Sequence, residues 1–168
     1  MIPMLEPILS EFRAEAAITQ RALDRVPGDK LSWKPHPKSM SLGQLALHVA
    51  RIPGLVSIVR LEEFDPSQVN FADPAVPAGV DEIHSVFREN VEAAEAYLSG
   101  MDEEAAQGAW RLVIKGKEVS SRPRVAVVRS LMLNHWYHHR GQLSVYLRLL
   151  EVPVPSIYGP SADESPFA

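Results

Sequence analysis

The chain has 168 residues, of which 46% are hydrophobic and 23% charged, so it suits one globular domain, residues 1–168, whose core needs no disulfide. The formal net charge is −4 and no dense run of Lys and Arg occurs, which argues against nucleic acid as a partner because phosphates are bound by clustered cations. Cysteine is absent, and this excludes disulfides, thiolate metal ligands and a cysteine nucleophile.

Hydropathy along the chain argues against a membrane segment. No uninterrupted apolar run reaches the ~20 residues that span a bilayer. The N-terminal stretch from Met1 to Glu6 carries an acid early and no basic residue, unlike a secretory signal. We therefore expect a cytoplasmic protein without a membrane partner, and the lack of cysteine fits a reducing compartment.

The first third of the chain predicts a helix followed by an extended segment. Apolar residues recur at three- and four-residue intervals from Ile2 to Leu23, which predicts an amphipathic helix that ends near Pro27. The segment from Asp29 to Met40 holds two prolines, and each disfavours helix at the residue before it. We expect this segment to be extended.

A capping box marks the start of the second helix. Ser41 is followed three residues later by Gln44, so each side chain can bond to the other's backbone amide. The apolar stripe that follows includes His48, and Pro53 predicts a kink about one turn after it. The proline-rich segment Glu62 to Gly79 is predicted to be a crossover loop.

The second half of the chain predicts a third helix, a hairpin and a last long helix. Apolar spacing from Ile83 to Leu98 indicates the third helix. The β-branched and aromatic run from Trp110 to Ile114, followed by Lys115-Gly116-Lys117, is typical of a small β-hairpin. The last helix is expected to start at Ser121 or Arg122, with Pro123 in its first turn.

The fold class that follows is all-α, a four-helix bundle with a small β-hairpin between the third and fourth helices. Bundles of this kind often hold metal sites between facing helices. The tail, residues 152–168, contains four prolines and is expected to lie as a strap over the surface.

Three histidines form the candidate metal site. His135 and His139 are four residues apart in the last predicted helix, so they share one helix face about one turn apart. His48 lies on the apolar stripe of the second helix, where a solvated histidine is not expected. Three imidazoles from two packed helices would leave one coordination position open, as in catalytic zinc sites.

The order of motifs resembles the DinB superfamily over nearly the whole chain. The resemblance rests on the segment Trp33-Lys34-Pro35-His36-Pro37-Lys38-Ser39, the following Ser41-Leu42-Gly43-Gln44 with His48, and the segment Asn134-His135 to His138-His139-Arg140-Gly141-Gln142. The tail segment Val154 to Glu164 is similar to the closing segment of one subgroup.

The resemblance implies a DinB/YfiT-type bundle with up-down-down-up helix order and a divalent metal, zinc or nickel, on His48, His135 and His139. It also implies a homodimer. Related proteins include metal-dependent hydrolases, transferases of low-molecular-weight thiols such as bacillithiol, and maleylpyruvate isomerases.

Three polar residues near the predicted ligands are further candidates. His138 lies about 60° from His135 around the helix, so it does not join the same coordination sphere. It is either an acid–base group or packs at a helix or subunit contact. Gln142 either anchors a ligand or bonds between helices, and Asn134 is placed to orient an imidazole through its second ring nitrogen.

Three aromatic residues are candidates for the substrate pocket. Trp33 and Trp136 either line its mouth or pack in the core, which is the default for aromatic side chains in bundles. Tyr158 reaches the site only if the tail folds back over it. No carboxylate stands at a spacing that identifies it as a general base.

The residues together predict a metal-dependent enzyme, either a hydrolase or a thiol S-transferase, that acts on a small-molecule substrate. Three neutral imidazoles leave the charge of a divalent ion uncompensated, so the ion can act as a Lewis acid. The alternative is a non-catalytic metal-binding or stress-associated protein. An all-imidazole site accepts several transition metals, so spacing alone does not choose between them.

Overall fold

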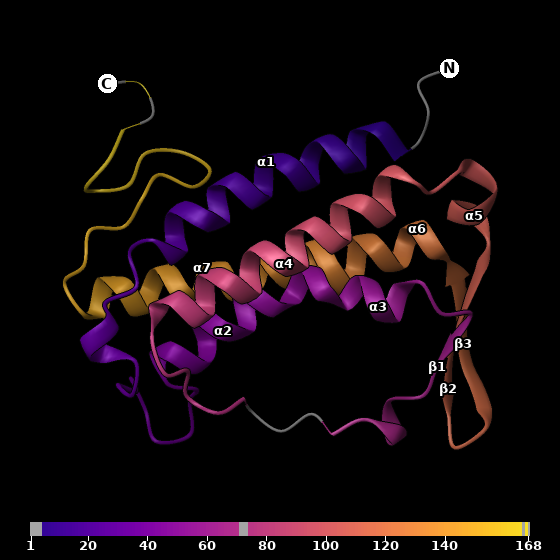
Figure 1. Ribbon diagram of the computed structural model, residues 1–168, viewed down its shortest axis with the longest axis horizontal. Helices are drawn as coiled ribbons and strands as arrows, with labels where there is room; N and C mark the ends of the chain where they lie inside the picture. Colours follow the sequence, from indigo (N-terminus) through magenta and orange to yellow (C-terminus); the bar gives the residue numbers. More distant parts are fainter. Residues whose placement is uncertain (1–4, 71–73, 166, 168) are drawn as a thin grey trace.

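Four long helices dominate the computed structural model, which describes residues 5–70, 74–165 and 167. They are α1 (Leu5–Leu23), α2 (Leu42–Arg51), α4 (Val80–Ser99) and α7 (His135–Leu149). Helices α1 and α2 each pack against both α4 and α7. Figure 1 shows α1 and α7 running in one direction and α2 and α4 in the other. Ile2, expected in the first helix, lies outside the described residues.

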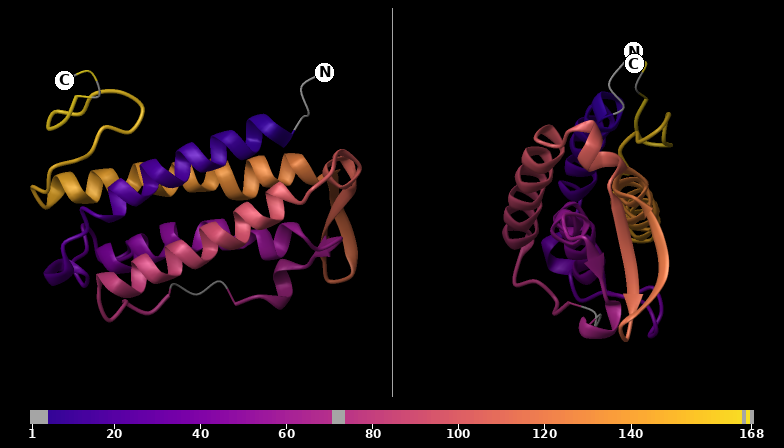
Figure 2. Two further views of the ribbon diagram at one scale, coloured as in Figure 1. Left: turned by 45° about the horizontal axis from the view of Figure 1, so that its top comes forward. Right: turned by 90° about the vertical axis from the view of Figure 1, so that its right-hand side faces the viewer.

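Shorter segments connect and extend the long helices. A 3-10 turn continues α2, and a π-helical segment joins α6 to α7 without a break in the helical path. The sheet closes one end of the molecule (Figures 1 and 2). The short helices are α3 (Val56–Val59), α5 (Glu103–Gln107) and α6 (Arg124–Val127), and the π segment is Val128–Asn134. The 3-10 turns are Gly28–Lys30, Ile52–Leu55 and Pro66–Gln68. The strands are β1 (Glu63–Phe64), β2 (Ala109–Ile114) and β3 (Lys117–Pro123).

The capping box of the second helix is confirmed. Ser41 Oγ accepts a hydrogen bond from the Gln44 amide at 3.2 Å, and Gln44 Oε1 accepts one from the Ser41 amide at 2.8 Å. Both bonds satisfy backbone donors that the first turn of a helix leaves without partners. Helix α2 therefore begins at Leu42, which sets the position of His48 along it.

Pro53 ends the regular part of this helix, and side chains from two other helices bind the carbonyls near it. Proline has no N–H, so the carbonyl of Val49, four residues earlier, lacks its helical donor. The indole N–H of Trp136 donates to that carbonyl at 3.1 Å, and the Asn90 amide donates to the next one, Ala50, at 3.2 Å. The α2 backbone is thereby tied to α7 and to α4.

Gly54 allows this approach of α4. A Cβ atom at position 54 would lie 2.3 Å from the side-chain oxygen of Asn90, which is far inside van der Waals contact. Only a residue without a side chain lets Asn90 reach the Ala50 carbonyl.

The predicted hairpin is present, and a further strand joins it. β2 and β3 pair antiparallel around the turn at Lys115-Gly116, where both residues have positive φ. β1 pairs parallel to β2 and makes the sheet three-stranded. Part of the expected crossover loop is therefore ordered as a strand, and residues 71–73 of that loop lie outside the described residues.

The expected start of the last helix was wrong by about two residues. Ser121 and Arg122 belong to β3, where they pair with β2, and Pro123 is the N-cap of α6 instead of its first-turn residue. The cross-strand hydrogen bonds of the hairpin extend farther than its local sequence indicates.

One stretch, Leu42–Val59, is long and apolar enough by length and composition to cross a membrane. However, 61% of it is buried inside the fold. Its apolar residues thus pack mostly in the core of this fold.

The tail packs over α1 and α7 through a buried ion pair. Arg140 is 1% exposed and Glu15 7% exposed, and their side chains meet at 2.5 Å. Arg140 also donates to Thr19 Oγ1 at 3.0 Å and to the Tyr158 hydroxyl. Tyr158 in turn donates to Glu15 at 3.0 Å, so the tail completes this polar cluster.

We predict that Trp136→Phe lowers the free energy of unfolding by about 1–3 kcal/mol, because the buried Val49 carbonyl loses its donor. Urea denaturation measures the change. Trp33→Phe is the control, since Trp33 is half-buried and its indole makes no hydrogen bond to another described residue. Equal losses in the two variants would contradict the role given to the bond.

We also predict that Glu15→Gln destabilises the protein by about 3–5 kcal/mol, because it leaves a buried guanidinium without its counter-charge. The matched change Glu95→Gln removes an exposed partner of Arg13 and should cost about 0–1 kcal/mol. Thermal and urea unfolding of both variants compare the two. A loss below 1 kcal/mol in Glu15→Gln would show that the buried pair is not important for stability.

Candidate metal centre

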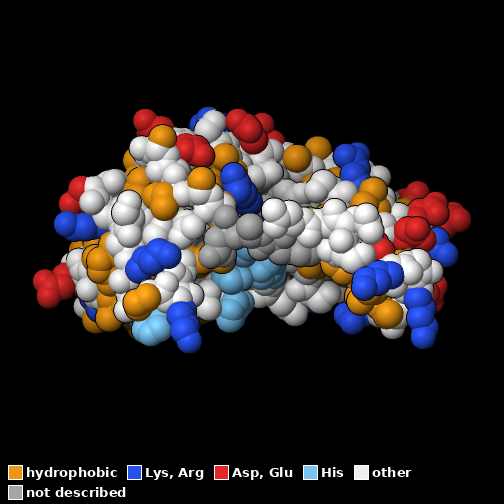
Figure 3. All heavy atoms as spheres, turned by 90° about the horizontal axis from the view of Figure 1, so that it is seen from below, with side chains coloured by type: hydrophobic (Ala, Val, Ile, Leu, Met, Phe, Trp, Pro, Cys, Tyr) orange, Lys and Arg blue, Asp and Glu red, His pale blue; other side chains and the backbone are white. Residues whose placement is uncertain are grey.

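Three histidines from two helices converge on one point. His48 comes from α2, and His135 and His139 come from α7; one nitrogen of each lies within 4.8 Å of the others. The ring centroids are 4.3–5.2 Å apart. All three side chains are half-buried, and Figure 3 shows histidine side chains gathered in a hollow of the lower face. The group could hold a metal ion.

Helix geometry and the Pro53 region explain why these rings meet. His135 and His139 are one turn apart on α7 and project from the same face. His48 is next to Val49, whose carbonyl is bound by Trp136, the neighbour of His135. The same backbone contact that joins α2 to α7 therefore places His48 opposite His135.

The spacing of one donor pair matches the edge of a tetrahedral site. The Nε2 atoms of His48 and His135 are 3.3 Å apart. With metal–nitrogen bonds of about 2.0–2.1 Å, the edge of a tetrahedron is about 3.3–3.4 Å. Two imidazole nitrogens at this distance suit a shared cation, and a third ligand from His139 leaves a position for an exogenous group.

Hydrogen bonding and burial keep the His139 ring neutral. Its Nδ1 lies 2.7 Å from Oε1 of Gln142, which can only accept, so Nδ1 carries the proton and Nε2 keeps its lone pair. Burial is the largest cause that lowers the pKa of His139 to about 4, followed by the neighbouring His48. Neither effect requires an ion, so the ring is neutral at neutral pH.

The ring of His135 is less completely hydrogen-bonded than that of His139. Burial lowers its pKa, while the backbone carbonyl of Leu131 acts in the opposite direction. Its Nδ1 is buried without a hydrogen bond of good geometry, although Nδ1 is the nitrogen that must carry the proton if Nε2 binds a metal. The π-helical segment Val128–Asn134 ends directly before this residue, a deviation common at functional sites and not predicted by the sequence.

A small cavity opens beside His139. Its volume is about 210 Å³. Gln142 and Tyr146 continue the His139 face of α7, and the opposite wall comes from the start of α2 and the loop before it. The lining residues are Ser39, Met40, Leu45, His139, Gln142 and Tyr146.

The polar candidates around the triad have different environments. Gln142 orients His139, as described above. His138 is exposed, with its ring centroid 4.8 Å from that of His139, which leaves it at the edge of the site. Asn134 is exposed at the end of the π segment.

The three aromatic candidates do not lie together at the site. Trp33 is half-buried and packs edge-on against Tyr146, behind the small cavity. Trp136 is completely buried between Phe12 and Phe87. The prediction that it lines a pocket mouth is therefore wrong, because its indole is needed in the core.

Tyr158 also lies away from the predicted pocket. Its hydroxyl contacts Arg140 and Glu15, and these bonds hold it on the side of α7 that faces α1. The tail does not bring it to the histidine face, which looks towards α2. Its role in lining a substrate pocket is thus not supported.

The sequence analysis missed two groups of lining residues. Tyr146 lies seven residues after His139, on the same helix face, so helical spacing could have found it. Ser39 and Met40 precede the capping box in an irregular segment, where no periodic signal points to a site.

Comparisons with known proteins agree with this fold. The chain is 23% identical over 170 residues to the uncharacterized protein YrdA of Bacillus subtilis, which covers 98% of this chain and 93% of that protein. A crystal structure of a DinB-like protein from Bacillus cereus is 26% identical, with a TM-score of 0.71 over 94% of this chain and all of that one.

A second solved structure shows the same fold. It is the DinB-like protein YjoA of Bacillus subtilis, 21% identical, with a TM-score of 0.66 over 86% of this chain and 92% of that one. The profile of the DinB family matches residues 1–166. The chain belongs to the DinB family.

Proposed function

We propose that this DinB protein is a metal-dependent enzyme that binds zinc or nickel on His48, His135 and His139 and acts on a small molecule. The observation that carries the proposal is the convergence of three imidazole nitrogens within 4.8 Å on an accessible face. We further propose that α1, α2, α4 and α7 form the up-down-down-up bundle of the family, which their directions in Figure 1 support.

A divalent ion held by three neutral ligands supplies Lewis-acid chemistry, which makes water or a thiol a nucleophile near neutral pH. The chain's own residues prepare this chemistry. Burial keeps His135 and His139 neutral, and Gln142 fixes the ring orientation of His139. We assign proton transfer to His138 because it is exposed and its ring centroid lies 4.8 Å from that of His139. Hydrolysis and thiol transfer are the two reaction classes that this arrangement serves.

The second candidate is a metal-binding protein without catalysis. One observation favours it: among residues 5–70, 74–165 and 167, the charged groups that shift the pKa values of His135 and His139 are other histidines. An enzyme that hydrolyses amides or esters usually places a base near its nucleophile. The exposed His138 is the group that separates the two proposals.

We predict that the protein, purified without a metal-affinity tag, binds one divalent ion per chain and that His48→Ala abolishes tight binding. The variant keeps two imidazoles, which are too few for a stable site of this kind. Elemental analysis after dialysis measures the stoichiometry. His36→Ala is the control, since His36 is exposed and bonds to the Lys38 amide. Full metal content in His48→Ala would contradict the assignment.

Catalysis is tested with the metal-loaded protein on ester, amide and thiol–electrophile panels. We expect turnover that is lost in His48→Ala and after chelation, and His138→Gln should lower kcat while leaving the metal content unchanged. Silence across all panels, with one ion bound, favours the non-catalytic alternative.

We also predict that the metal-free protein loses stability as the pH falls from about 6.5 towards about 4. In this window His139 is protonated in the unfolded chain and neutral in the folded chain. The unfolded state therefore binds more protons, so acid lowers the free energy of unfolding. Above the unfolded pKa the contribution is constant. Urea unfolding at pH 7.5 and 5 compares wild type with His139→Gln, in which the decline should be smaller. Parallel declines would contradict the lowered pKa.

A further inference from the structure

A second pocket lies between the sheet and the helical segment that leads into α7. Its floor is one face of the three strands. Phe64 pairs with Leu112, Leu112 with Ser120, and Trp110 with Arg122, so these residues from β1, β2 and β3 lie side by side. Alternation along a strand turns their side chains to one face of the sheet.

The opposite wall of this sheet pocket is the start of the last helix. Val127, Ser130 and Leu131 face the strands and enclose a volume of about 240 Å³. A cavity of about 150 Å³ lined by apolar side chains accepts benzene. The sheet pocket is therefore large enough for one substituted aromatic ring or a short branched chain.

The sheet pocket lies next to the metal ligands. Leu131 lines it and precedes His135 by four residues along the same helix. His139 follows His135 by one turn and lines the small cavity described above. The two cavities thus lie on either side of His135 and His139 along the last helix, and His48 of α2 faces these two histidines. A molecule in the sheet pocket can extend a reactive group to the histidines.

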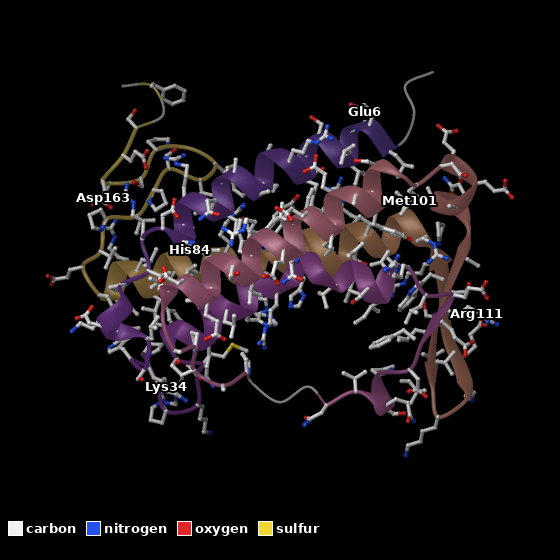
Figure 4. The ribbon with its side chains drawn as sticks, viewed as in Figure 1. Glu6, Lys34, His84, Met101, Arg111 and Asp163 are labelled. Carbon is white, nitrogen blue, oxygen red and sulfur yellow. The ribbon has the colours of Figure 1, made fainter. Side chains whose placement is uncertain are left out.

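Arg122 gives the sheet pocket a positive charge. Its Nε donates to Ser120 Oγ at 3.3 Å, and it forms no ion pair within the part of the chain that the structure describes. The other arginines nearby are engaged. Arg111 pairs with Glu63 at 2.9 Å, on the outer side of the sheet (Figure 4), and Arg124 donates to the Val59 and Leu61 carbonyls.

We propose that the sheet pocket binds the apolar end of the substrate and that Arg122 binds its carboxylate. The substrate class is then a small aromatic or branched aliphatic carboxylate, whose reactive group reaches the triad. Guanidinium is suited to this role because its planar fork matches a carboxylate with two parallel hydrogen bonds. The substrate class rests on the proposed enzymatic function, whereas binding in the sheet pocket does not.

The test uses 3-phenylpropionate and its neutral analogue 3-phenyl-1-propanol as probes in calorimetric titrations of the full chain. We expect the carboxylate to bind more tightly than the alcohol. Arg122→Gln should lower the affinity for the carboxylate by about tenfold or more and leave the affinity for the alcohol unchanged. Arg111→Gln is the matched control on the opposite face of the same strands and should change neither probe.

A second variant tests the location. Ser130 is exposed, so Ser130→Leu is compatible with folding, which circular dichroism and thermal unfolding verify, and its side chain fills the pocket. We expect both probes to lose binding in this variant. Equal affinity for the two probes in wild type, or binding unaffected by Ser130→Leu, overturns the proposal.

Titrations of chelated protein and of His48→Ala separate this proposal from the metal site. Probe binding that persists without metal supports the sheet pocket even if the protein proves to hold no ion. Carboxylate binding that needs the metal and ignores Arg122→Gln overturns the pocket and leaves the metal centre intact.

Discussion

The hydrogen bond from the Trp136 indole to the Val49 carbonyl is the contact on which the position of the site depends. Pro53 deprives that carbonyl of a helical donor, and a buried carbonyl without a partner costs about 1–3 kcal/mol. A shift of α7 along or around α2 would move the indole away from this carbonyl. Since His48 and His135 are the sequence neighbours of the two bonded residues, satisfying this one backbone acceptor also brings two of the three clustered histidines together.

Keeping histidines neutral in a partly buried site lowers the stability of the folded chain in acid, and other contacts must offset this loss. Burial lowers the pKa values of His135 and His139, so acid favours the unfolded chain, and the orphaned Nδ1 of His135 adds a further loss. On the other side of α7, the buried Arg140–Glu15 pair and the packed Trp136 stabilise the same helix. A bound cation would relieve the strain at the histidines, because it binds the folded state alone.

Most local patterns were read correctly from the sequence, whereas several contacts between distant segments were not. Segment 29–40, expected to be extended, instead contains a 3-10 turn and bends. The capping box at Ser41, the hairpin and the shared face of His135 and His139 depend on residues close in the chain, so their spacing was enough. The burial of Trp136 depends on a carbonyl 87 residues away, and the strand at Glu63–Phe64 exists only because β2 lies beside it. No periodicity within either segment carries that information.

The run from α2 to α3 connects the histidine triad to the sheet that lines the second pocket. Two of its carbonyls accept hydrogen bonds from tryptophan side chains. The Val49 carbonyl accepts one from Trp136 of α7, and the Ile58 carbonyl accepts one from the Trp110 indole of β2 at 3.2 Å. The sheet is therefore fastened to this run independently of the histidines. Substitutions on the pocket face of the sheet can change which molecule is held, while the register that brings His48 to His135 stays the same. The proposed recognition and the proposed metal binding would then be separable by substitution, although both depend on one helix run.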